Sequence, residues 1–384
     1  MGLVILEFPL KINFTKLAAY MHIKRLLFFC GLLFMGFYSF SQSISKKVNT
    51  ESAENYFKIA TLLKNDQQVV ESQWQSLFQT PIYQMMIAGK AIDTIYLKEA
   101  MHSIFGSKNM AVKKPLPSKE IYHQFYKDNQ TKLEVYIKLL HTANTVDSVK
   151  ALVYPFLPKR LQKESLFPKL YYLNYGKPEA TGYGGIVIND LLHSYQIDSY
   201  KFGLLAAHEA FHAIVSVAFH QSLKPSIDYN DPSFNLLYFL QNVSEEGIAD
   251  LIDKSLLMKR SSPVYLEVSQ LIENDESLSI KYISSLDSLL KHAFVSENVL
   301  QSYNSFPLFA NAFGKNGGHI PGRFMGMTIM QSGLLQNHIM SIEDPIAFVL
   351  TYNESVEKSK SKYPLFSKES IQYLQKLRTK FLKF

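Results

Sequence analysis

The sequence predicts an α+β fold that is predominantly helical and contains one small sheet. Three observations predict it. Residues 50–144 repeat apolar side chains at helical spacing, Leu204–Phe219 has the character of a buried helix, and two short β-rich runs lie just before it. Of the 384 residues 47% are hydrophobic and 19% are charged, which excludes a largely disordered chain.

The N-terminus has the features of an export signal. Two basic residues precede an uncharged apolar run, Leu26–Phe40, and polar residues follow it. This run is shorter than the roughly 18 apolar residues that a spanning helix needs, so we expect a signal peptide within residues 1–41. Met21 is the more natural start, and residues 1–20 are expected to be a mis-annotated start or a tail. The mature protein would then be secreted or periplasmic, without a membrane span.

Cysteine content and charge exclude several classes of function. Cys30 is the only cysteine, and it lies inside the signal region. The mature chain therefore has no thiol nucleophile and no disulfide, and a metal ion would have to be held by histidines and carboxylates. The signal region contributes +3 to the formal net charge of +7, so the mature chain carries only a mild charge, and the lysine-rich C-terminus is typical of a solvated helix face. No basic stripe with interleaved aromatics is present, so nucleic acid is not an expected partner.

Two regions are expected in the mature chain. Residues 50–150 are predicted to form an N-terminal helical region that lines one side of the active site. Within this region, Trp74 is expected to pack against a neighbouring helix. A proline-rich breaker at 113–118 separates its helices. A second proline-rich interval at 154–168 marks a boundary, so residues 151–384 are expected to form the second region, which ends in C-terminal helices.

The second region opens with two predicted strands joined by a turn. Lys169–Tyr175 is rich in β-forming residues, and the glycine-rich stretch Thr181–Gly185 runs into Ile186–Asn189. Glycines there would let another backbone approach closely, as a substrate strand does at a sheet edge, which makes Tyr183 and Gly184 candidate substrate-binding residues. A bulge or turn without a ligand explains the glycines equally well.

The apolar run that follows contains three polar residues, His208, Glu209 and His212. Asp198 or Ser199 is expected to cap this helix. Because the histidines are four residues apart, both imidazoles leave the same helix face and can give one metal ion two nitrogen ligands. Glu209 beside them is placed to take a proton from water. The alternative is two core histidines and a capped glutamate, since a short motif also arises by chance.

A third protein ligand completes a hydrolytic zinc site, and the stretch from Ser244 to Asp250 offers it. We expect Ser244 to cap the start of an apolar helix. Glu245 and Glu246 compete for the metal, and Glu246 is preferred because Asp250 lies one turn beyond it. Asp250 could then accept a hydrogen bond from a metal-bound imidazole. The alternative is a solvated helix start.

With these residues the chain resembles the gluzincin, or Peptidase-MA-like, zinc metallopeptidases, and within them a poorly characterised secreted bacterial branch. The gluzincins share a His-Glu-x-x-His motif on one helix and a metal-binding glutamate on a following helix, often within Glu-Gly-x-Ala. This sequence has His208–His212 and Glu246–Ala249. The resemblance implies a zincin-like catalytic domain over 151–384, one zinc ion held by the two histidines and Glu246, Glu209 as general base, and peptide-bond hydrolysis.

A weaker match to these relatives lies at residues 317–326. Glycines and a proline surround His319 and lead into a helix, and relatives of this kind carry a similar Gly-His-Pro-x-Gly element. His319 or Arg323 could stabilise the oxyanion that forms when a carbonyl is attacked, with Tyr183 as a third candidate. The same run could equally be a loop that only caps a helix.

Two other functions fit the same residues. One is a zinc hydrolase that acts on an ester or a cell-wall amide instead of a peptide. The other is a non-catalytic secreted protein in which a structural metal holds helices together. All three readings require zinc, so only cleavage of a substrate separates them.

Overall fold

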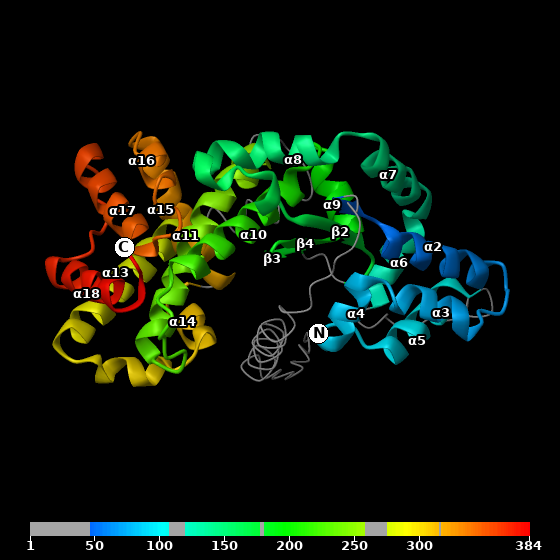
Figure 1. Cartoon of the computed structure of the whole chain (residues 1–384), viewed down its shortest axis with the longest axis horizontal. Helices are drawn as coiled ribbons and strands as arrows, with labels where there is room; N and C mark the ends of the chain where they lie inside the picture. Colours follow the sequence, from blue (N-terminus) through cyan, green and yellow to red (C-terminus); the bar gives the residue numbers. More distant parts are fainter. Residues whose placement is uncertain (1–46, 107–119, 177–179, 258–274, 315) are drawn as a thin grey trace, which may run out of the picture.

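The computed structural model describes residues 47–106, 120–176, 180–257, 275–314 and 316–384 (Figure 1). The predicted signal peptide at 1–41 and the breaker at 113–118 lie outside the described residues. The described residues are mostly helical and contain one four-stranded sheet. This agrees with the predicted α+β class. Among the described helices, none combines the length and the apolar composition that a membrane span requires.

The elements fall into three groups along the chain. The first group is β1 (Val48–Asn49), α2 (Glu51–Lys64), α3 (Glu71–Phe78), α4 (Pro81–Ala88), α5 (Thr94–Phe105), α6 (Glu120–Asp128), α7 (Gln130–Thr142) and α8 (Thr145–Val153). The second group follows three short 3-10 helices and comprises β2 (Lys169–Leu173), β3 (Ala180–Tyr183), β4 (Ile186–Asp190), α9 (Leu191–Asp198), α10 (Leu204–Ser222) and α11 (Pro232–Leu257). The third group is α13 (Asp275–Val295), η5 (Glu297–Tyr303), α14 (Phe306–Phe313), η6 (Asn316–Gly318), α15 (His319–Gln331), α16 (Leu335–Ile339), α17 (Pro345–Ser359) and α18 (Lys368–Phe381).

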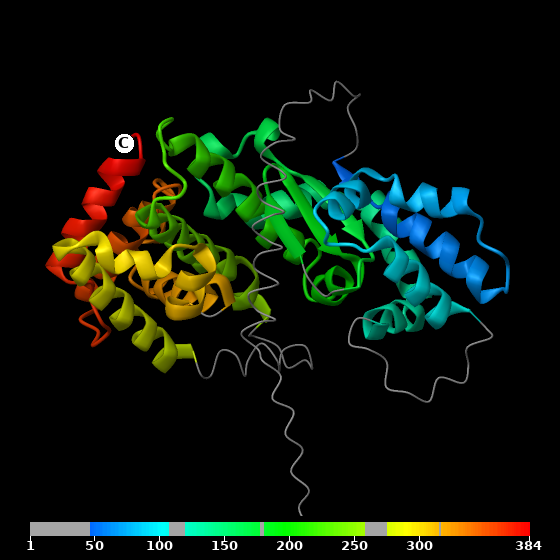
Figure 2. The ribbon, with the colours of Figure 1, turned by 90° about the horizontal axis from the view of Figure 1, so that it is seen from below.

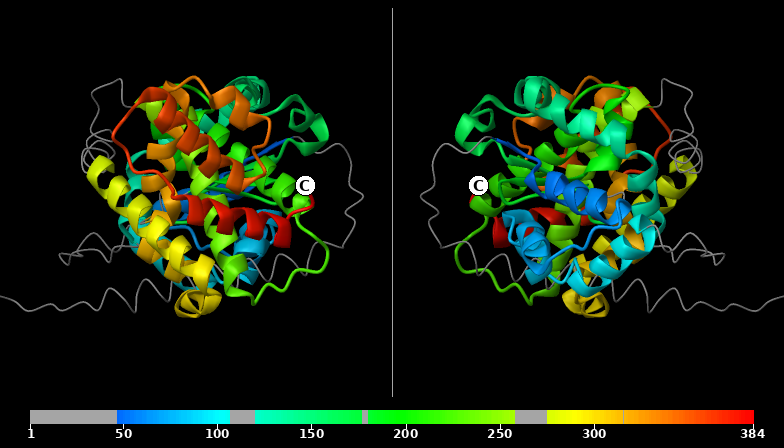
Figure 3. Two further views of the ribbon diagram at one scale, coloured as in Figure 1. Left: turned by 90° about the vertical axis from the view of Figure 1, so that its left-hand side faces the viewer. Right: turned by 90° about the vertical axis from the view of Figure 1, so that its right-hand side faces the viewer.

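These groups are arranged along the long axis of the molecule. Helices α2 to α5 form one end, the sheet lies in the middle, and α13 to α18 form the other end (Figures 1 and 2). Figure 3 shows the two ends face on, with α13 and α18 at one and α2 at the other. Helix α10 lies between the sheet and α11, contacting β3 and β4 on one side and α11 on the other. The centre of the molecule is therefore built around the predicted buried helix.

The N-terminal helices follow their predicted spacing closely. The sequence pattern predicts helices at Asn55–Lys64, Val69–Leu77, Thr94–Phe105 and Lys119–Leu140. Helices α2, α3 and α5 lie at the first three positions, the fourth is divided into α6 and α7 near Asn129, and α4 was not predicted. Trp74 of α3 packs against α5 as expected, with its ring centroid 5.9 Å from that of His102. One continuous cluster of buried residues includes members from the N-terminal helices to α18, so the N-terminal helices share a core with the rest of the chain.

The sheet has one more strand in its central part than the sequence suggested. Its order is β1-β2-β4-β3, with β1, β2 and β4 parallel and β3 antiparallel at the edge. The glycine-rich stretch before the second predicted strand contains a strand of its own, β3, which pairs Tyr183 with Ile186 across a two-residue turn. Gly184 and Gly185 form this turn with φ values of 57° and 82°. Two consecutive positive φ values suit the twist of a tight hairpin and favour glycine.

Gly182 explains why the edge strand β3 can lie directly on α10. A Cβ atom on Gly182 would lie 1.7 Å from the backbone oxygen of Glu209. The close backbone approach that the glycines suggested is therefore an approach to α10, in addition to the hairpin turn. This contact sets the position of β3 along α10, at the helix turn that carries Glu209.

Gly182→Ala is expected to destabilise the protein by at least the ~1–3 kcal/mol that is typical of overpacking, because backbone atoms stand where the methyl group would go. Thr181→Ala on the same strand is the matched control, since Thr181 is exposed. Urea denaturation of both variants measures the effect. Equal unfolding midpoints for Gly182→Ala and the control would contradict the close approach of β3 to α10.

Three further glycines bring α11 and α15 into near backbone contact. A Cβ atom on Gly247 would lie 2.5 Å from the oxygen of Gly322, and one on Gly326 would lie 2.2 Å from the oxygen of Gly247. Side chains at these positions would push the helices apart. The crossing places the first residue of α15, His319, beside the acidic stretch of α11.

Candidate metal centre

Helix α10 holds its polar residues inside the protein. The exposed fractions of His208, Glu209 and His212 are 4%, 8% and 9%. The helix begins after Gly203, and Asp198 Oδ1 accepts a hydrogen bond from the backbone N–H of Leu204 at 3.1 Å. The expected N-cap, Asp198 or Ser199, is therefore replaced by Gly203, while Asp198 at the end of α9 accepts a hydrogen bond from the first turn of α10. Burial raises the pKa of Asp198 to about 6, although hydrogen bonds to its carboxylate partly oppose the rise.

Helix α11 is longer than the sequence suggested. It starts at Pro232, and Asp231 accepts a hydrogen bond from the backbone N–H of Ser233 at 2.8 Å. Ser244 is therefore a buried residue inside the helix, and the prediction that it caps a helix start is wrong. The apolar residues before Ser244 continue the helix because their side chains are buried in the core. Glu246 consequently projects from the middle of a packed helix, which holds it more rigidly than a helix end would.

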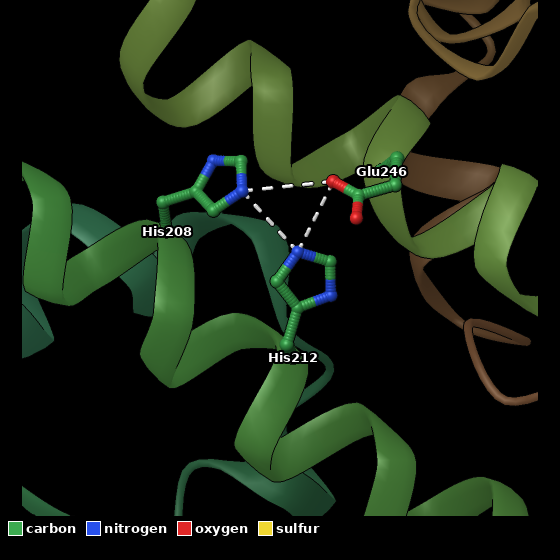
Figure 4. Close-up of side chains that lie close together, drawn as sticks. All are labelled: His208, His212 and Glu246. Atoms are coloured by element: carbon green, nitrogen blue, oxygen red, sulfur yellow. Dashed lines mark hydrogen bonds and ion pairs between the residues drawn. The ribbon is translucent and has the colours of Figure 1, made fainter. Parts of the chain in front are cut away.

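The structure brings together the three residues expected to bind the metal (Figure 4). His208 Nε2 lies 3.2 Å from His212 Nε2. Glu246 Oε2 lies 3.6 Å from His208 Nε2 and 3.3 Å from His212 Nε2. The side chains come from two different helices, and their donor atoms form a nearly equilateral triangle.

The other nitrogen of each imidazole is held by a buried carboxylate. His208 Nδ1 donates to Asp253 Oδ1 at 3.1 Å, and His212 Nδ1 donates to Glu245 Oε2 at 3.0 Å. Gln241 Nε2 in turn donates to Glu245 Oε1 at 2.8 Å. A carboxylate can only accept from these rings, so each Nδ1 carries a hydrogen and each Nε2 is the nitrogen available to a metal ion.

This arrangement fits a zinc ion. The Nε2 atoms of two imidazoles and a carboxylate oxygen face one another, an arrangement that a cation between them stabilises. Glu246 Oε2 is buried and has no hydrogen-bond partner of normal geometry among the described residues. Tetrahedral zinc with donors about 2.0–2.1 Å away holds them about 3.3 Å apart, close to the three measured separations. The donor set of two imidazoles and one carboxylate is also one that zinc prefers.

The charges of the site lead to the same conclusion. Burial alone would lower the pKa of His208, but the neighbouring Asp253 carboxylate raises it to about 10. Burial would raise the pKa of Glu246, yet the adjacent rings of His319 and His212 hold it well below its usual range. The buried carboxylates therefore require positive charge beside them, and a bound metal would displace protons from the rings.

Glu209 differs from the other carboxylates of the site. Burial raises its pKa, and the neighbouring charges of His208 and His212 oppose this rise. It does not belong to any of the metal-ligating groups formed by the described residues. Its carboxylate is therefore influenced by the charges of the triangle without supplying one of its donor atoms.

His319 also lies at the site, as expected. Its Nδ1 is 3.1 Å from Glu246 Oε2 and 3.3 Å from both carboxylate oxygens of Asp250. Its ring is stacked on that of His208, with centroids 6.2 Å apart. Its side chain is 36% exposed, whereas that of His208 is 5% exposed. Arg323 is buried on α15, one turn beyond His319.

The two candidate residues of the sheet lie farther along α10. The hydroxyl group of Tyr183 is 3.5 Å from Nε2 of His220, two turns beyond His212. Gly184 is exposed in the hairpin turn. Neither belongs to the clusters of metal-ligating groups formed by the described residues.

Three residues of the site were not predicted from the sequence. Glu245 and Asp253 orient the two imidazoles, and Lys254 Nζ lies 2.7 Å from Asp253 Oδ2. Asp253 stands seven residues after Glu246, which is two turns along the same helix face, so the spacing did contain a signal for it. The position of Glu245 depends on the angle between α10 and α11, which the sequence alone does not give.

Comparison with known families agrees with this geometry. A family model described as "Putative zinc dependent peptidase (DUF5700)" matches residues 74–361, which include every residue of the site. Searches of curated proteins and of solved structures returned no match. Because the match covers well over half of the chain, the protein belongs to the family that carries this description.

Proposed function

We propose that this protein is a secreted metallopeptidase of the gluzincin type, with one zinc ion held by His208, His212 and Glu246. The observation that carries the proposal is the triangle of donor atoms, whose sides of 3.2, 3.3 and 3.6 Å suit tetrahedral zinc. Three protein ligands leave a fourth position for water or substrate, as catalytic zinc sites do. When bound, the ion supplies Lewis acidity, which acidifies water and polarises a carbonyl group.

The roles of the surrounding residues follow from their positions. Glu209 accepts the proton of the attacking water and passes it to the leaving nitrogen. Its raised pKa suits a group that must both accept and return a proton near neutral pH. His319, the most exposed of the three imidazoles, stabilises the oxygen on which negative charge develops. The edge strand β3, beside α10, offers backbone groups with which an extended peptide could pair.

The proposed localisation is outside the cytoplasm, either secreted or periplasmic. Its support is the sequence pattern of a basic pair, a short apolar run and a polar end before residue 42. A mature chain without cysteine is compatible with export, because its folding does not depend on disulfide formation.

The proposal predicts that purified protein cleaves members of a peptide library, that a zinc chelator abolishes cleavage, and that added zinc restores it. Mass spectrometry of the products measures cleavage, and a non-chelating analogue of the chelator is the control. Hydrolysis of esters or cell-wall amides without peptide cleavage would favour the non-peptide hydrolase. A stoichiometric zinc content without any hydrolysis would favour a structural metal.

A further inference from the structure

Two buried aspartates lie almost one turn apart on α11, and they contact different imidazoles. Helical spacing suggested that Asp250 would support a metal-binding histidine. In the structure Asp250 Oδ1 is 4.0 Å from His208 Nδ1, whereas Asp253 Oδ1 is only 3.1 Å away. Asp250 instead places both of its oxygens 3.3 Å from His319 Nδ1. The expected role of Asp250 is therefore filled by Asp253.

We propose that Asp253 orients His208 for the metal, whereas Asp250 orients His319 for the substrate. Asp250 is then a positioning residue of the reaction, and Asp253 is a positioning residue of metal binding. This division rests on the proposed function, because it assigns separate tasks within the same site.

Burial explains why both carboxylates keep fixed partners. Asp250 is 2% exposed and Asp253 is 1% exposed. A buried carboxylate is costly unless it is paired and hydrogen-bonded. Asp253 has His208 and Lys254, whose Nζ is 2.7 Å from Oδ2, while the same Nζ is 3.7 Å from Asp250. The closest hydrogen-bonding group to the Asp250 carboxylate is thus the His319 ring, which binds both of its oxygens equally.

The exposure of the imidazoles indicates what each orientation serves. The side chains of His208 and His212 are 5% and 11% exposed, and their Nε2 atoms face each other and Glu246. His319 is 36% exposed and contacts the acidic residues through Nδ1. A ring anchored at Nδ1 by a buried carboxylate has a fixed direction for Nε2. His319 can therefore present Nε2 to a ligand on the open side of the site.

Glu246 does not replace Asp250 in this role. Its Oε2 lies 3.1 Å from His319 Nδ1, but the same atom faces both metal-binding rings. Once Glu246 is engaged as a ligand, Asp250 is the carboxylate that remains to hold His319. Glu246 belongs to two groups of residues that could hold a metal ion, one with His208 and His212 and the other with Asp250 and His319. Glu246 is the only residue common to these two groups, so His319 and Asp250 lie together on one side of it.

The test compares Asp250→Asn with Asp253→Asn in the full mature chain. Competition with a chromophoric chelator measures the zinc dissociation constant, and peptide cleavage at saturating zinc measures kcat and KM separately. For Asp253→Asn we expect zinc binding to weaken by roughly 10–100-fold with a nearly unchanged kcat. For Asp250→Asn we expect an unchanged zinc dissociation constant and a kcat lowered by up to roughly 10²-fold with little change in KM.

Asp344→Asn is the matched control, because Asp344 is an equally buried carboxylate that caps α17. It reports the effect of removing a buried charge on stability alone. Equal losses of zinc affinity in the Asp250 and Asp253 variants would overturn the division of roles. So would an unchanged kcat in Asp250→Asn, or a loss of kcat in Asp344→Asn of the same size.

A spectroscopic readout separates this inference from the proposed function. In proton NMR the Nδ1–H resonance of His319, assigned by its loss in His319→Gln, should be lost or shifted upfield in Asp250→Asn and retained in Asp253→Asn. This measurement requires neither cleavage nor an active metal. A protein that cleaves no peptide but shows this pattern would refute the peptidase and support the pairing, whereas retention of the resonance in Asp250→Asn would refute the pairing.

Discussion

Replacing Glu209 with glutamine is expected to leave the zinc content unchanged and to lower peptide hydrolysis by roughly 10²–10⁴-fold, the usual contribution of a general base. Glutamine keeps the size and shape of the side chain, and Glu209 is not one of the donor atoms of the triangle. Its amide group cannot accept a proton from water, so the step that Glu209 performs is lost while the ligands remain.

The measurement combines metal analysis by mass spectrometry with kcat/KM on a peptide found in the library. Glu164→Gln is the control, because Glu164 is an exposed carboxylate that pairs with Lys150 on the surface. Undiminished turnover in Glu209→Gln would remove Glu209 from the mechanism. Loss of zinc in this variant would show instead that Glu209 takes part in holding the ion.

The buried helix α10 could be predicted because the sequence pattern that indicates it is local. An apolar run with His208 and His212 four residues apart fixes both the helix and the face on which the rings lie. Glu246 was distinguished from Glu245 by a carboxylate one turn beyond it, and it does face the rings. Yet the carboxylate that contacts His208 most closely is Asp253, so Glu246 was selected through Asp250, a residue that contacts a different ring, that of His319.

The parts that could not be predicted depend on how helices cross. Local spacing does not reveal that Gly247 and Gly322 allow α11 and α15 to touch, although that contact brings His319 to Glu246. The extent of α11 was also missed, because Ser244 is typical of a helix start and only its burial shows otherwise. In the sheet, the glycines before Ile186 predicted a turn, while pairing across that turn made a strand of the residues before it.

Alanine substitution of the neighbouring glutamates of α11, Glu245 and Glu246, is expected to affect zinc binding and hydrolysis to very different extents. Glu246→Ala removes one of three ligands and leaves a site with two imidazoles, so zinc is expected to be lost on dialysis together with all hydrolysis. Glu245→Ala leaves the three ligands in place and removes only the carboxylate that holds His212 Nδ1 at 3.0 Å. The loss of such a partner weakens metal binding by roughly 10–100-fold, so excess zinc should restore activity to this variant.

Because the two residues are adjacent on one helix and both are largely buried, they lose similar packing when truncated, and each variant controls for the other. Zinc titration of the dialysed proteins, followed by cleavage assays at each zinc concentration, measures the difference. The expected result is full recovery for Glu245→Ala and none for Glu246→Ala. The opposite order would make Glu245 the ligand. Recovery in both variants would mean that two imidazoles suffice, which argues against a ligand role for Glu246, whose buried Oε2 atom faces both rings.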